Sequence, residues 1–198
     1  MQQQHKELFA EIDRIWPLRA ETKVRLSVIG SGALMLQADY ERGTKDSDVF
    51  ETTGLSSEIK EHLSRVAGAG SDLHRRWKLY IDIVANGVPF LPHVPIWHPV
   101  VALNRTSQHI ELFALDIVDV VVSKLKRFHA NDQADIDAMV ERNLVSHGRL
   151  IERFCAAADE FSGDARASEL PKYIKHLHRV ERDMLGVPET EIELPPWI

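Results

Sequence analysis

The sequence has little of several features that define specialised protein classes. Cys155 is its only cysteine, which excludes an internal disulfide and predicts a small buried side chain at that position. No apolar run approaches the roughly 18 residues that a membrane span needs. The N-terminal segment is polar and then amphipathic, unlike a secretory signal. Together these absences predict a cytoplasmic protein with no membrane contact.

An excess of positive charge is also missing. The chain has 24 Lys and Arg residues against 30 Asp and Glu residues, so its formal net charge of -6 argues against a general polyanion binder. Basic residues nevertheless gather at 74–78, 124–129 and 172–182. Each cluster is interpreted either as a solvated face or as a local groove aimed at one substrate.

Apolar periodicity is present and divides the chain into two parts. Branched, alternating runs predict short strands, and apolar positions at helical spacing predict helices. The pattern indicates an α+β fold, with a small mixed-sheet core at 1–115 followed by a helical region at 116–198. Strands are expected at 24–30, 47–52, 78–85 and 109–115, helices at 5–20, 31–38 and 56–68, and a proline-rich connection that is neither helix nor central strand at 86–100.

A turn joins the first strand to the next helix through Gly30 and Ser31. A helix N-terminus offers free backbone N–H groups and the positive end of a dipole, so it binds phosphate well. Glycine allows the ligand to approach the backbone, and Ser31 adds a hydroxyl. The turn is therefore a candidate phosphate site, although the same dipeptide also forms ordinary tight turns.

Carboxylates follow on the next two strands. Asp46 and Asp48 are two residues apart in "RGTKDSDVF", so in a strand their side chains share one face. Asp82 lies among apolar neighbours in "YIDIV", where a carboxylate is either edge-facing or part of a site. Alone, the aspartate pair also fits a polar turn with a helix-capping residue.

The order of these features favours one chemistry. A phosphate-binding turn, two paired aspartates and a third aspartate on the following strand predict a cation cluster beside a triphosphate. Carboxylate oxygens suit Mg²⁺, which binds through one or two carboxylates together with substrate phosphates. Two such ions, held by Asp46, Asp48 and Asp82, orient an attacking oxygen and neutralise charge on the transferred phosphate.

This arrangement resembles the polymerase-β-like nucleotidyltransferase superfamily, whose signature is a glycine-serine turn, a D-x-D strand and a third carboxylate strand. Within it the chain is similar to the bacterial toxin-type branch, the AbiEii and MenT nucleotidyltransferases. The resemblance covers roughly residues 20–140. It rests on "GSGALML", on the R-x-T-x-D-x-D spacing that begins at Arg42 and Thr44, and on "SKLKRFHANDQADIDAM".

The resemblance implies further site residues. Arg42 and Thr44 are expected at the nucleotide, together with Gly30 and Ser31. The last motif places Lys124 and Asp132 there as well, and matches a D-x-x-D helix start in which Asp135 is the second aspartate. From the residues alone, Lys124 also fits the solvent-facing edge of an amphipathic helix, and both aspartates fit a helix cap.

Three functions are compatible with these residues. The first is a Mg²⁺-dependent nucleotidyltransferase that moves a nucleoside monophosphate from an NTP to a hydroxyl of RNA, such as a tRNA end, or of protein. By resemblance it would belong to a toxin–antitoxin system with a cognate antitoxin or regulatory protein. The second is a non-catalytic module with the same fold that binds nucleotide or a partner. The third, a nuclease or phosphatase, is disfavoured by the phosphate-binding turn.

Overall fold

The computed structural model describes residues 2–16, 23–38, 40–163 and 165–194. The chain forms two compact units, the first made of Met1–Val88 and Trp97–Leu115 and the second of Pro89–Ile96 and Asp116–Ile198. Within the described residues, no helix is long and apolar enough to cross a bilayer. That the two parts are separate domains stays a prediction.

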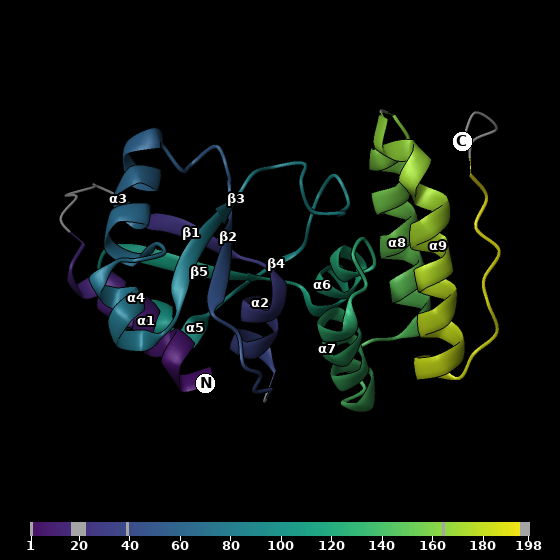
Figure 1. The fold of residues 1–198 in the computed structure, drawn as a ribbon, viewed down its shortest axis with the longest axis horizontal. Coiled ribbons are helices and arrows are strands. Elements are labelled where there is room, and N and C mark those ends of the chain that lie inside the picture. The colour runs from purple at the N-terminus through teal and green to yellow at the C-terminus, as the bar shows by residue number, and fades with distance from the viewer. Residues whose placement is uncertain (1, 17–22, 39, 164, 195–198) are drawn as a thin grey trace. The chain divides into compact units, whose positions relative to one another are not determined.

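Strands in the described part of the first unit form one mixed five-stranded sheet (Figure 1). Its strands are β1 (Val24–Val28), β2 (Asp46–Phe50), β3 (Tyr80–Val84), β4 (Trp97–Pro99) and β5 (Ile110–Leu115). The order across the sheet is β3-β2-β1-β5-β4. β1 is parallel to β5 and antiparallel to β2, β2 is parallel to β3, and β4 is antiparallel to β5. The predicted α+β fold is confirmed.

The two faces of the sheet differ chemically because side chains alternate along each strand. Leu26, Val49 and Ile81 share one face and are buried. Asp46 and Asp48 point to the opposite face, since they alternate with Ser47 and Val49 on β2. The helix after β1 lies on the apolar face, where a Cβ atom on its Gly32 would be 3.0 Å from the Ser47 hydroxyl. The acidic side chains therefore project from the face opposite this helix.

Helices of the first unit are α1 (Gln2–Arg14), α2 (Gly30–Gln37), α3 (Ser57–Ala67), α4 (Asp72–Trp77) and α5 (Val101–Asn104). The predicted helix at 5–20 is confirmed as far as Arg14, and residues 17–20 lie outside the described residues. Ser56 caps α3 by accepting a hydrogen bond from the Ile59 N–H. Asp13, near the end of α1, accepts backbone hydrogen bonds at the start of β5 and so ties the helix to the sheet.

The second unit is helical, as the sequence predicts. It contains α6 (Ile117–Lys124), α7 (Ala130–Glu141), α8 (His147–Ser162), a 3-10 helix (Ala165–Glu169), α9 (Leu170–Arg179) and a π-helix (Val180–Leu185). Helices α8 and α9 lie side by side (Figure 1). Phe90 from the proline-rich connection packs between the rings of Phe154, Phe161 and Tyr173 at centroid distances of 4.9 to 5.4 Å. This aromatic cluster explains why Pro89–Ile96 belongs to the second unit.

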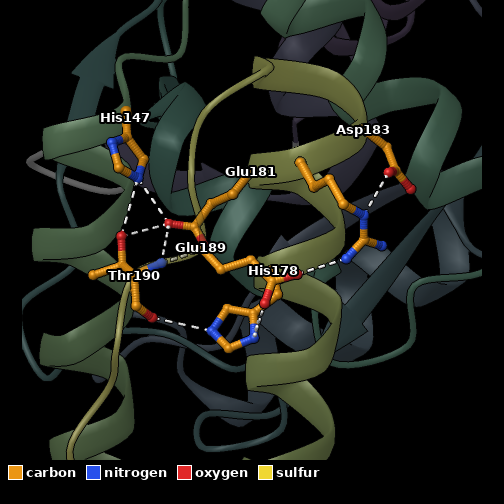
Figure 2. Close-up of polar contacts among 7 residues, drawn as sticks. His147, His178, Glu181, Asp183, Glu189 and Thr190 are labelled. Atoms are coloured by element: carbon orange, nitrogen blue, oxygen red, sulfur yellow. Dashed lines mark hydrogen bonds and ion pairs between the residues drawn. The ribbon is translucent and has the colours of Figure 1, made fainter.

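A buried carboxylate fastens the chain that follows the π-helix (Figure 2). Glu181 is fully buried and accepts hydrogen bonds from the Thr190 hydroxyl at 2.6 Å, from the Thr190 N–H at 3.1 Å and from His147 at 2.7 Å. His178 contacts the Thr190 carbonyl from the other side. Burial alone would raise the pKa of Glu181, but the hydrogen bonds from Thr190 and His147 hold that pKa below its usual value. The ionised carboxylate thus serves as the anchor of this segment.

Candidate active site

The turn between β1 and α2 packs directly against β2. The Ile29 N–H donates to the Asp48 carbonyl at 2.9 Å, so the turn is fixed to the strand that carries the paired aspartates. Gly30 has a φ of +62°, and a Cβ atom there would be 2.9 Å from the Asp48 carboxylate oxygen. Glycine is therefore required at this position both by the backbone conformation and by the close approach to Asp48.

We expect Gly30→Ala to lower the free energy of unfolding by about 1–3 kcal/mol, because the left-handed conformation is strained for alanine. The contact with Asp48 adds to this loss and displaces the carboxylate. Gly148→Ala in α8 is the matched control, since a Cβ atom there meets nothing within 4 Å. Urea unfolding of both variants measures the difference. Equal stability of the two variants would contradict this description of the turn.

The three predicted carboxylates lie on one face of the sheet. Asp46 and Asp48 share a face of β2, and the parallel register pairs Asp48 with Asp82 on β3. Paired residues of neighbouring strands have adjacent side chains. Asp46 and Asp48 are half-buried, whereas Asp82, on the edge strand, is exposed. Like charges this close repel one another, so the arrangement favours a bound cation.

The combined charge of these aspartates affects the pKa of Tyr80. It is the register partner of Asp46 and shares the face of Asp82, two residues along β3. Burial raises the pKa of the Tyr80 phenol, and the negative charges of Asp46, Asp82 and Asp48 raise it further. The phenol therefore stays protonated at neutral pH and is a hydrogen-bond donor beside the acidic cluster.

Two residues of the loop before β2 contact the candidate site, one at the turn and the other at the first aspartate. Arg42 donates a hydrogen bond to the Ser31 hydroxyl at 3.2 Å. Thr44 donates to the Asp46 carboxylate at 2.6 Å. The structure thus forms two separate contacts here, with the Arg42 guanidinium beside the turn at Ser31 and the Thr44 hydroxyl beside the first aspartate.

The donor set fits Mg²⁺ if substrate oxygens complete the coordination. Among the described residues, no group of three or more His, Cys, Asp or Glu side chains could hold a metal ion. Mg²⁺ does not require such a cage, because it is usually bound by one or two carboxylates, phosphate oxygens and water. Asp46, Asp48 and Asp82 supply hard oxygen ligands of this kind, and the turn at Gly30 lies against one of them.

Lys124 and its partners form a second cluster, which lies in the helical unit. Only 5% of the Lys124 side chain is exposed, and its ammonium is 2.7 Å from Asp135 and 3.2 Å from Asp132. Asp132 also accepts from the His129 N–H in a capping box and contacts Arg127 at 3.4 Å. The capping role considered for Asp132 is confirmed, and the solvent-facing alternative for Lys124 is wrong. A contact of Lys124 or Asp132 with nucleotide stays a prediction.

The sequence indicated a basic cluster at 74–78 but predicted neither the helix that carries it nor the position of Tyr80 beside the carboxylates. The alternation on β3 places Tyr80 with Asp82, but its pairing with Asp46 depends on the strand register. Helix α4 has only six residues and one buried apolar side chain, Leu73, so it leaves almost no periodic signal. The His74 ring of this helix meets the Tyr80 ring edge-on at a centroid distance of 5.0 Å.

A mixed sheet that carries three carboxylates on one face beside a glycine-serine turn is an arrangement typical of nucleotidyltransferases. The comparison with protein families agrees. The family described as "Nucleotidyltransferase of unknown function (DUF6036)" matches residues 3–181, and the chain belongs to this family. No curated protein and no solved structure matches the chain significantly.

Proposed function

We propose that this protein is a Mg²⁺-dependent nucleotidyltransferase that moves a nucleoside monophosphate from an NTP to an acceptor hydroxyl. The observation that carries the proposal is the register of β2 and β3, which aligns Asp48 with Asp82 on the face that Asp46 also shares. Family membership supports nucleotidyl transfer in general. The acceptor is RNA, such as a tRNA end, or a protein, and a cognate antitoxin or regulatory protein would control the activity.

Each site residue has a defined role in this proposal. Asp46, Asp48 and Asp82 would hold the Mg²⁺ ions, and Asp82 would act on the acceptor side. Bound Mg²⁺ supplies charge neutralisation for the transferred and leaving phosphates. The N–H groups at Gly30 and Ser31 bind the triphosphate at the start of α2.

The two loop residues position the reacting groups. Thr44 fixes the Asp46 carboxylate through its 2.6 Å hydrogen bond. Arg42, held by the Ser31 hydroxyl, places a positive charge at the triphosphate. Asp82 helps to activate the acceptor hydroxyl. The acceptor oxygen then forms a bond to the α-phosphorus as the bond to the bridging oxygen breaks, and pyrophosphate leaves.

Nucleotide binding tests the site independently of the acceptor. Calorimetric titration with each NTP is expected to show binding in Mg²⁺ that is lost in EDTA and in the Asp46→Asn, Asp48→Asn double variant, because the phosphates share the ions with these carboxylates. Asp137→Asn, Asp159→Asn, with two exposed aspartates of α7 and α8 changed, is the control and is expected to bind normally. Binding of an NTP that needs neither Mg²⁺ nor the aspartates would contradict the proposal.

A further inference from the structure

The edge of the sheet beyond Asp82 carries an aromatic ring and a group of cations that the proposed transfer reaction does not yet use. The sheet order places the phosphate-binding turn, which follows β1, on one side of β2 and the edge strand β3 on the other. A triphosphate bound at that turn leaves the β3 side for the acceptor. Any side chain there that faces the carboxylates is a candidate acceptor contact.

Tyr80 is the ring in this position. It pairs with Asp46 across the β2–β3 ladder and is half-buried. The His74 ring packs edge-on against it at 5.0 Å, and His74 is itself oriented because its Nδ1 atom accepts the Gly70 N–H at 2.8 Å. The phenol is thus a fixed, partly exposed ring beside the acidic cluster.

The helix that supplies His74 also carries cations. Arg75 and Arg76 on α4 are 66% and 65% exposed, and Lys78, which ends the helix, is also exposed. Arg75 contacts Asp72 and the Gly70 carbonyl, and Arg76 lies 3.4 Å from Glu11 of α1. These surface pairs are weak in water and exchange readily for phosphate. The helix whose His74 ring contacts Tyr80 therefore carries a positive segment directly before the strand of Asp82.

A fixed ring with exposed cations beside it is the combination that binds single-stranded nucleic acid, in which bases stack and phosphates pair with Lys and Arg. We infer that Tyr80 and its neighbours form the acceptor-binding surface and that the acceptor is a single-stranded RNA end. The surface consists of the Tyr80 ring, the His74 ring that packs against it, and the cations Arg75, Arg76 and Lys78. This inference rests on the proposed transferase function. The chain's net charge of -6 restricts nucleic-acid binding to this local surface instead of the whole molecule.

The test uses the full chain and fluorescein-labelled single-stranded RNA of mixed sequence, with binding followed by anisotropy in Mg²⁺. Arg75→Ala, Arg76→Ala, Lys78→Ala is expected to weaken RNA binding and to lower the slope of log affinity against log salt by about 2, at roughly 0.7 per phosphate contact. Lys23→Ala, Arg65→Ala, Arg105→Ala removes the same charge from exposed positions elsewhere in the first unit and is expected to bind nearly as the wild type does.

The ring is tested separately. Tyr80→Ala is expected to weaken RNA binding roughly tenfold, and Tyr80→Phe, which keeps the ring, much less. Calorimetric binding of Mg²⁺ and NTP is expected to remain in every variant, which shows that the carboxylate site and the fold are intact. Binding of RNA that is equal in the cation triple variant and its control overturns the inference. Transfer of label to protein alone, without RNA binding, also overturns the inference but is compatible with the transferase function. Failure of the wild type to bind NTP would instead contradict the transferase function itself.

Discussion

The Asp46→Asn, Asp48→Asn double variant is expected to lose nucleotide transfer by about 10³-fold or more and to remain folded. Both substitutions keep the shape of the side chain and remove the negative charge that holds the cations. Loss of several kcal/mol of charge stabilisation in the transition state corresponds to a rate loss of this size. Initial rates of pyrophosphate release, measured for both proteins at the same NTP and Mg²⁺ concentrations, give the effect.

The stability of this double variant separates a chemical role from a structural one. Asp46 and Asp48 repel each other and Asp82 across the β2–β3 ladder, so removing two charges is expected to leave the free energy of unfolding unchanged or slightly higher. The control variant Asp137→Asn, Asp159→Asn is expected to keep both rate and stability. Transfer that persists in the Asp46→Asn, Asp48→Asn variant would place the reaction elsewhere in the chain.

Lys124→Met is expected to lower the free energy of unfolding by about 3–5 kcal/mol. Methionine has about the length of the lysine side chain but carries no charge. Asp132 and the fully buried Asp135 therefore lose their shared cation. Removing one partner of a buried ion pair exposes the full cost of desolvating the other. Urea unfolding of the variant measures the loss. Lys175→Met, at an exposed position of α9, is the control and is expected to change stability by less than about 0.5 kcal/mol.

A second substitution tests whether loss of the ion pair itself causes the loss of stability. Lys124→Met combined with Asp135→Leu is expected to be more stable than Lys124→Met alone, because the unpaired buried carboxylate is removed. If Lys124→Met instead kept normal stability and weakened NTP binding, the ammonium would be a nucleotide ligand, as the resemblance to toxin-type nucleotidyltransferases predicts. The two outcomes are measured on the same protein samples.

Local sequence patterns were sufficient for the elements of the first unit but not for their arrangement. Alternation identifies the strands at β1, β2 and β3 because each has one apolar face to bury. The pairing of β1 with β5 joins segments about 80 residues apart, and no local pattern specifies such a contact. β4 is three residues long among prolines, which agrees with the expectation that prolines are confined to edge strands.

In the candidate site, too, local spacing predicts part of the geometry and the fold alone determines the rest. The spacing of Asp46 and Asp48 is sufficient to place them on one face, as found. The pairing of Asp48 with Asp82, and of Asp46 with Tyr80, depends on the strand register, which only the fold specifies. Helical spacing also could not predict the burial of Lys124, because that burial depends on carboxylates from the next helix.

Label transfer tests the central claim most directly. The purified protein is incubated with each α-labelled NTP, Mg²⁺, total cellular RNA and total cellular protein, beside the Asp46→Asn, Asp48→Asn variant. We predict that label from at least one NTP becomes covalently attached to RNA with the wild type and not with the variant. If label entered neither RNA nor protein while the wild type still bound NTP and Mg²⁺, the transferase claim would be contradicted, and the chain would be a nucleotide-binding module without catalytic activity.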